Sequence, residues 1–164
     1  MWIDRLLEPV LAQRARTRPV VVLTGARQTG KTALVRRVFP AHTYVSLDLP
    51  SEAEQAELDP TAFLARHPEP LVVDEVQYAP GLLRHLKRRV DERREENGRF
   101  ILTGSQPFPL MTGVAESLAG RVAVLTLDGL SHAEIVRARP RVTTEDVLLR
   151  GGFPELHAKL DIDS

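Results

Sequence analysis

Residues Gly25-Ala26-Arg27-Gln28-Thr29-Gly30-Lys31-Thr32 form a complete G-x-x-x-x-G-K-T phosphate-binding loop. The apolar, β-branched run 19–24 before it predicts a buried strand, and the run 33–39, which ends at Pro40, predicts a helix. A strand, a glycine-rich loop and a helix, in that order, are the context in which this motif cradles phosphates. The sequence therefore predicts a nucleotide site at this loop.

The loop chemistry assigns roles to its residues. Gly25 and Gly30 permit a tight turn and a close approach of the backbone to phosphate, and successive N–H groups at a helix start form an anion nest. Lys31 is expected to reach the β- and γ-phosphates, and the hydroxyl of Thr32 to ligate Mg²⁺. Arg27 either touches phosphate or is simply solvated. The predicted nucleotide-binding set is Gly25, Ala26, Arg27, Gln28, Thr29, Gly30, Lys31, Thr32 and Ala33.

A second apolar run, Leu71-Val72-Val73, ends in the carboxylates Asp74 and Glu75. Open α/β sheets bind ligands at the carboxyl ends of their strands. Asp74 is predicted to hold Mg²⁺ through water, and Glu75 to orient and deprotonate the attacking water. The alternative is an exposed acidic strand end. Glu75 also disfavours a small-molecule kinase, which needs no water-activating glutamate and carries an arginine-rich lid that is not seen here.

Two further catalytic candidates follow. The run 99–102 predicts a strand that ends in Thr103-Gly104-Ser105-Gln106, and Ser105 is the first choice to sense the γ-phosphate, ahead of Thr103 and Gln106. The alternative is a turn that uses its own hydroxyls. Arg121, directly before the strand 122–127, is either an arginine finger, in cis or from a neighbouring chain, or a solvated strand-edge residue.

The run 21–32 resembles the start of prokaryotic P-loop ATPases of the AAA+ type, which often carry an uncharacterised second domain after the ATPase core. The resemblance continues through 71–77, 102–105, 116–121 and 151–155. It implies ATP as the nucleotide, Lys31 and Thr32 in the phosphate-binding role, and Asp74 and Glu75 in the metal and hydrolysis roles. It also implies the strand order 5-1-4-3-2.

The expected fold is an α/β parallel sheet with strands near 19–24, 43–48, 70–74, 100–104 and 122–127. We expect an ATPase core with an N-terminal helix over 1–128 and the start of a helical lid over 129–164. Proteins of the resembled family continue further, so the chain is expected to be a truncated version, a fragment or a short paralogue.

Several helices are predicted. Apolar residues at helical spacing predict a helix within 2–16, which Pro9 kinks or restarts. Ser51 with Glu54 and Ser131 with Glu134 read as capping boxes, Asp59-Pro60 starts a helix to His67, and Thr143 or Thr144 caps another that Gly151-Gly152 closes. Residues 107–120 are expected to be a loop with a short helix.

Composition narrows the function. The 164 residues contain 22 basic and 22 acidic side chains, so the net charge does not indicate binding to nucleic acid or to a membrane. The chain has no cysteine and therefore no disulfide framework. The start of the chain lacks a signal-peptide layout, no apolar run spans a bilayer, and the histidines lack metal-ligand spacing. A cytoplasmic setting is expected.

The helix predicted over 81–96 carries the one basic cluster of the chain. Acidic residues lie among its arginines at pairing distance, and no aromatic residues interleave, which favours a solvated face over a nucleic-acid platform.

The first hypothesis is an Mg²⁺-dependent ATPase that acts on a protein partner or on a C-terminal domain, with oligomerisation left open. The second is a nucleotide-gated binding module that binds ATP without significant hydrolysis on its own. A GTPase is disfavoured because no N-K-x-D motif exists, and Asn97 is the only asparagine.

Overall fold

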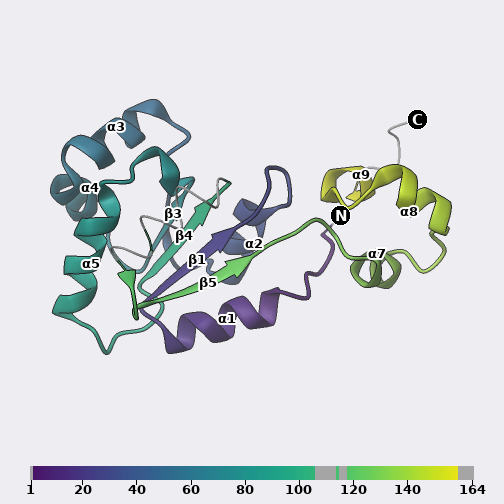
Figure 1. Cartoon of the computed structure of the whole chain (residues 1–164), viewed down its shortest axis with the longest axis horizontal. Coiled ribbons are helices and arrows are strands. Elements are labelled where there is room, and N and C mark those ends of the chain that lie inside the picture. The colour runs from purple at the N-terminus through teal and green to yellow at the C-terminus, as the bar shows by residue number, and fades with distance from the viewer. Residues whose placement is uncertain (1, 106–113, 115–117, 159–164) are drawn as a thin grey trace.

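The computed structural model describes residues 2–105, 114 and 118–158. Its centre is a five-stranded parallel sheet of the order β2-β3-β4-β1-β5 (Figure 1). This is the predicted order 5-1-4-3-2 read from the other edge, and it confirms the expected P-loop fold class. The strands are β1 (Val20–Thr24), β2 (Thr43–Ser46), β3 (Leu71–Asp74), β4 (Phe100–Gly104) and β5 (Val122–Thr126).

The sheet is buried on both faces because its central strands alternate apolar side chains between two hydrophobic clusters. Val20 and Val22 of β1 point to the face covered by α3 (Pro50–Leu58), α4 (Pro60–Arg66) and α5 (Leu82–Glu92). Val21 and Leu23 point to the face covered by α1 (Glu8–Thr17) and α2 (Lys31–Val38). Near-continuous apolar strands are typical of parallel sheets covered by helices on both sides.

The strand register gathers the predicted site at one edge of the sheet. Thr24 at the end of β1 pairs with Gly104 at the end of β4, and Val73 pairs with Leu102. The phosphate loop follows β1, Asp74 ends β3 and is followed by Glu75, and Ser105 follows β4. All three therefore leave the sheet at its carboxyl edge.

Two helix boundaries differ from the sequence prediction. Residues 2–5 are not helical, and α1 begins at Glu8 with Pro9 in its first turn, where proline needs no N–H partner. Ile3 is instead buried against the C-terminal helices. The helix predicted over 81–96 ends at Glu92.

Of the two caps predicted for α3 and α4, the one at Asp59 is confirmed and the one at Ser51 is wrong. Asp59 caps α4 by accepting the N–H of Ala62 at 3.0 Å, as predicted. The capping box at Ser51 is wrong, because the N-cap of α3 is Leu49, two residues earlier, and the helix begins at Pro50. A proline that fixes the first helical φ angle takes the place of a side-chain cap.

Three short helices follow the sheet, α7 (His132–Ala138), α8 (Thr144–Arg150) and α9 (Pro154–Ala158), and lie together beyond one end of the sheet (Figure 1). Ser131 and Thr143 cap α7 and α8 with complete capping boxes. Leu130 and Ile135 form a separate small apolar cluster with Ile3. The predicted helix within 107–120 lies largely outside the described residues.

Candidate nucleotide-binding site

The phosphate loop joins β1 to α2 through a backbone with three left-handed residues. Gly25 has φ 144°, Gln28 has φ 64° and Gly30 has φ 91°. A Cβ on Gly25 would lie 2.1 Å from the carbonyl oxygen of Leu127, so only glycine fits there. A loop of alternating handedness that ends at a helix start directs successive N–H groups into a shared concavity, which is an anion nest.

Lys31 is the first residue of α2, at the end of this loop, and is buried. Its ammonium donates to the carbonyl oxygens of Gly25 at 3.0 Å and Ala26 at 2.8 Å. Burial lowers the pKa of Lys31, and the nearby carboxylates of Glu75 and Asp74 oppose that shift. The ammonium is therefore a poorly hydrated cation beside the nest, which suits it to bind a phosphate oxygen.

Asp74 is a buried carboxylate saturated by hydroxyl donors. Its Oδ2 accepts the hydroxyl of Thr32 at 2.8 Å and that of Tyr44 at 2.7 Å, and its Oδ1 accepts the hydroxyl of Thr103. Burial and the hydrogen bond to Asp74 raise the pKa of Tyr44, so its phenol stays protonated and donates. Thr32 is thereby held against the predicted metal carboxylate.

The donor set fits Mg²⁺. Thr32 and Asp74 offer hard oxygen atoms, and Mg²⁺ is usually bound by one or two carboxylates together with substrate phosphates and water. Among the described residues, no group of three or more His, Cys, Asp or Glu side chains could hold a metal ion. Phosphate oxygens would have to supply the remaining ligands.

Glu75 adopts a left-handed conformation with φ 58°, which is rare outside glycine and turns its side chain out of the strand direction. Its Oε2 accepts the amide of Gln77 at 2.5 Å and the hydroxyl of Ser105 at 3.0 Å. Its N–H donates to Thr103 at 3.1 Å. Ser105 therefore lies beside the predicted base, and Gln106, its predicted alternate, falls outside the described residues.

The loop and the carboxylate share one cavity. A cavity of about 400 Å³ is lined by Arg27, Gln28, Gly30, Lys31, Thr32, Ala33, Asp48 and Glu75. Thr29 is buried and donates its hydroxyl to the carbonyl of Ala26 at 3.0 Å, so it stabilises the loop. Arg27 donates to the hydroxyl of Tyr78 at 3.1 Å and also faces this cavity.

A second cavity of about 240 Å³ also adjoins the loop. It is lined by Trp2, Ile3, Arg5, Thr29, Gly30, Ala33, Leu130, Pro154, Glu155 and Ala158. Gly30 and Ala33 line both cavities, so they lie at the boundary between a polar space and a mainly apolar one.

Arg121 is not brought to this site. Val122, the next residue, pairs with Val20 at the start of β1, so Arg121 lies at the amino edge of the sheet while the phosphate loop leaves the carboxyl edge. Its guanidinium binds Asp91 of α5 at 2.5 Å. Five parallel-strand residues separate the two edges by roughly 16 Å, so the cis form of the arginine-finger prediction is wrong.

Four residues of the site region were not predicted from the sequence: Tyr44, Asp48, Gln77 and Arg5. The pairing of β2 with β3 brings Tyr44 near Asp74, and this pairing cannot be read from residue 44 alone. Gln77 lies two residues after Glu75 in the sequence, so its place near the site could have been predicted. Arg5 donates to the loop carbonyl of Thr29 at 2.8 Å from a segment with no motif of its own.

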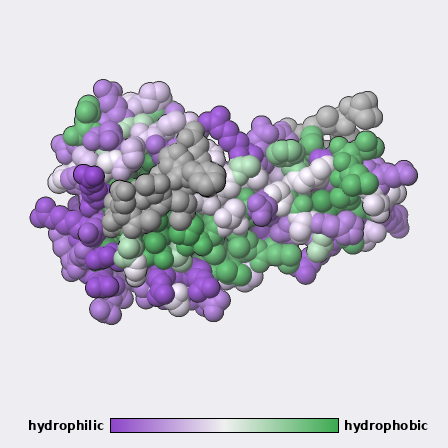
Figure 2. All heavy atoms as spheres, in the orientation of Figure 1, coloured by the Kyte–Doolittle hydropathy of each residue, from purple (hydrophilic) through white to green (hydrophobic). Residues whose placement is uncertain are grey.

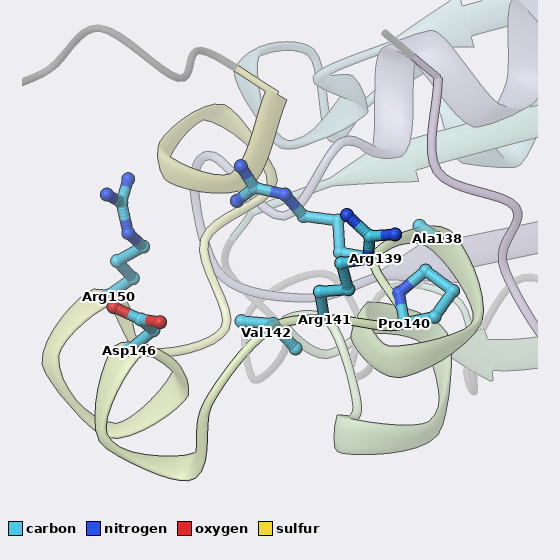
Figure 3. Close-up of a pocket in the computed structure, with 7 residues that line it drawn as sticks. All are labelled: Ala138, Arg139, Pro140, Arg141, Val142, Asp146 and Arg150. Carbon is cyan, nitrogen blue, oxygen red and sulfur yellow. The ribbon is translucent and has the colours of Figure 1, made fainter.

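A further cavity of about 570 Å³ lies away from the loop among the C-terminal helices (Figure 3). Arg139 and Arg141 extend on one side of it, and Asp146 lies beside Arg150 (Figure 3). No residue of this cavity belongs to the phosphate site.

Comparison with solved structures agrees with this class of fold. The chain superimposes on AMPPCP-bound DnaA from Aquifex aeolicus with a TM-score of 0.57, 13% identity, and coverage of 93% of this chain and 57% of that one. It superimposes on the STAND protein PH0952 from Pyrococcus horikoshii with a TM-score of 0.53, 20% identity, and coverage of 93% and 28%. These similarities establish a P-loop NTPase fold.

The family follows from sequence. The AAA domain profile matches residues 17–136, so the chain belongs to the AAA domain family. Uncharacterized proteins Rv2008c of Mycobacterium tuberculosis and Mb2031c of Mycobacterium bovis are 36% identical to it over 156 residues, which is 94% of this chain. The chain spans about a third, 34%, of the length of these curated relatives. Family and loop together indicate a nucleotide-binding domain of the AAA+ type.

Proposed function

We propose that the chain binds ATP with Mg²⁺ and hydrolyses it. The observation that carries the proposal is the convergence of Lys31, Thr32 and Glu75 on one cavity, with Asp74 hydrogen-bonded to Thr32 at 2.8 Å behind it. A fixed cation, a nest of N–H groups and a poised carboxylate are the parts that phosphoryl transfer to water requires.

Each residue has a task in this proposal. Lys31 and the loop N–H groups hold the β- and γ-phosphates, while Thr32 and Asp74 hold Mg²⁺, which neutralises charge on those phosphates. Glu75 orients a water molecule and accepts its proton. Ser105, 3.0 Å from Glu75, is positioned to sense the γ-phosphate.

We also propose that residues 1–128 form the ATPase core and that residues 129–164 begin a helical lid. The apolar cluster of Leu130 and Ile135 is separate from both sheet clusters, which supports that division. Nucleotide turnover would drive or gate a protein partner or a C-terminal domain. Among the described residues, no helix is both long and apolar enough to cross a membrane.

One observation favours the alternative of a binding module that needs a partner for turnover. Arg121 is engaged with Asp91 at 2.5 Å and lies at the opposite edge of the sheet from the phosphates of its own chain. An arginine finger supplied by this residue would have to come from a neighbouring chain.

The test is ATP turnover and ATP binding by the wild type, Glu75→Gln and Lys31→Ala, with Mg²⁺. We expect Glu75→Gln to bind ATP normally and to lose turnover by about 10²- to 10⁴-fold, because the base is removed but its shape is kept. Lys31→Ala should bind ATP about 10- to 100-fold more weakly, because a charged hydrogen-bond donor is lost.

Glu92→Gln is the matched control, because Glu92 is an exposed residue of α5 that pairs with Arg88 at 3.4 Å. It should behave as the wild type. Binding without turnover in the wild type would select the binding-module alternative, and no ATP binding at all would contradict both functions.

A further inference from the structure

Arg5 is a buried arginine that contacts the phosphate loop from outside it. Only 7% of the residue is exposed, although it lies in the non-helical N-terminal segment. Its Nη1 donates to the carbonyl of Thr29 at 2.8 Å, and its Nη2 donates to the carbonyls of Asp128 at 2.7 Å and Gly129 at 3.2 Å. One guanidinium thus joins the loop to the connection between β5 and α7.

The arginine is itself fixed by a buried partner. Its Nε donates to Oε1 of Glu134 at 3.2 Å, and Glu134 is 6% exposed. Glu134 also accepts the N–H groups of Leu6 and Ser131, both at 2.7 Å. Because the carboxylate neutralises the guanidinium and is anchored at several points, the fork of Arg5 has one defined orientation.

The contact with Thr29 orients the next amide of the loop. A peptide bond is planar and trans, so the carbonyl of Thr29 and the N–H of Gly30 point in opposite directions. Arg5 holds the carbonyl on the side of the second cavity, which Arg5 and Thr29 both line. The N–H of Gly30 therefore points away from the Arg5 guanidinium, and Gly30 also lines the phosphate cavity.

Few other contacts on this peptide are seen in the described part of the chain. Gly30 has φ 91°, and outside its chain neighbours a Cβ there would meet no described heavy atom closer than 3.9 Å. Among the described residues, Arg5 is the side chain that donates to the Thr29 carbonyl. A glycine peptide held by one hydrogen bond depends on that bond for its orientation.

We propose that Arg5 is a positioning residue for phosphate binding, which acts through the Thr29–Gly30 peptide and never touches the nucleotide. It preorganises the Gly30 N–H for the β-phosphate, so the loop meets its ligand without reorienting. This inference rests on the proposed ATP-binding function.

The test compares ATP, ADP and AMP, each titrated calorimetrically with Mg²⁺, because AMP lacks the β-phosphate. The main variant is the double substitution Arg5→Met with Glu134→Gln. It removes both buried charges, and replacing such a pair together is tolerated better than leaving one charge unpaired. The single variant Arg5→Met is measured beside it.

Arg99→Met is the matched control. Arg99 is also buried, binds Glu69 at 2.6 Å and donates to the carbonyl of Arg89 at 2.8 Å, but it lies directly before β4, at the amino edge of the sheet. Its loss should lower stability and leave the relative affinities for the three nucleotides unchanged.

We expect the Arg5 variants to bind ATP and ADP about tenfold more weakly, the effect of losing roughly one good hydrogen bond, and to bind AMP within about twofold of the wild type. The ¹⁵N amide resonance of Gly30 should also shift in the unliganded double variant, while that of Gly98 stays in place.

Three results would overturn the proposal. They are ATP and ADP affinities unchanged in the folded double variant, an equal loss for AMP, and the same pattern in Arg99→Met. A wild type that binds neither ATP nor ADP would instead refute the proposed function, and this inference with it.

Discussion

At the scale of single residues, the site is organised by buried carboxylates with several donors each. Asp74 accepts hydroxyls from α2, β2 and β4, and Glu134 accepts N–H groups from two segments as well as the Arg5 guanidinium. Burying a charge is costly unless it is paired and hydrogen-bonded. Each carboxylate therefore fixes the relative positions of the segments that supply its donors.

Glu134 makes stability depend on pH. Burial alone would raise its pKa, but the N–H groups of Ser131 and Leu6 and the charge of Arg5 hold that pKa below its usual value of 4.5. A lowered folded-state pKa contributes stability that is complete above about 4.5 and is lost as the pH falls through the folded-state pKa. Glu134→Gln should therefore cost about 3 to 5 kcal/mol at pH 7, because it leaves Arg5 unpaired.

The difference in the free energy of unfolding between the wild type and Glu134→Gln should become smaller as the pH falls below 4.5. Urea unfolding at pH 7, 5, 4 and 3 measures this difference. Glu92→Gln should follow the wild type throughout, because exposed ion pairs contribute little. A difference in the free energy of unfolding that does not change with pH would refute the assigned role of the Glu134 charge.

At the scale of elements, similar sequence signals produced different starts for neighbouring helices. Asp59 accepts the N–H of Ala62 at 3.0 Å, whereas Ser51 lies inside α3 and makes no capping bond. The two positions are eight residues apart in helices that pack together. Asp59, which makes a capping hydrogen bond, can therefore be compared directly with Ser51, which makes none.

Asp59→Ala should lower the free energy of unfolding by about 1 kcal/mol, the usual value of an N-cap, and Ser51→Ala should change it by less than about 0.5 kcal/mol. Chemical denaturation of the two variants checks this. Equal losses would show that Ser51 contributes to the start of α3 after all.

The two faces of the long basic helix α5 make different contacts. Leu82, Leu83, Leu86 and Val90 are buried, as their spacing predicts. Its charged face pairs internally through Arg88 and Glu92 at 3.4 Å, and Asp91 binds Arg121. These pairs agree with the preferred interpretation of a solvated face.

At the scale of the whole molecule, the sheet and the C-terminal helices bury their apolar residues very differently. Leu102 of β4 is fully buried, whereas Leu149 of α8 is 85% exposed. Figure 2 shows hydrophobic residues gathered at the surface over the end of the molecule that holds α7 to α9. Stability therefore resides mainly in the sheet.

Leu102→Ala should cost about 2 to 5 kcal/mol, because it opens a cavity between the sheet and its helices. Leu149→Ala removes the same atoms from an exposed site and should stay within about 0.5 kcal/mol. Thermal and urea unfolding distinguish the two. A large loss in Leu149→Ala would show that this leucine is covered in solution.

The sequence by itself determined the local features of this protein. The five strands, the phosphate loop with Lys31 and Thr32, and the two carboxylates at the end of β3 each depend on residues close together in the chain. Periodicity and motif spacing are local signals, so they were readable without a structure. The strand order came from the family resemblance, since parallel pairing leaves no local trace.

The tertiary structure decided what lies next to what. Tyr44 meets Asp74 because β2 pairs with β3, Arg5 reaches Thr29 because the N-terminal segment folds back onto the loop, and Arg121 lies away from the phosphates because β5 runs parallel to β1. Tyr44 and Asp74 are 30 positions apart in the chain, and Arg5 and Thr29 are 24 positions apart. Strand pairing and burial fix such distances, and no window of the sequence contains them.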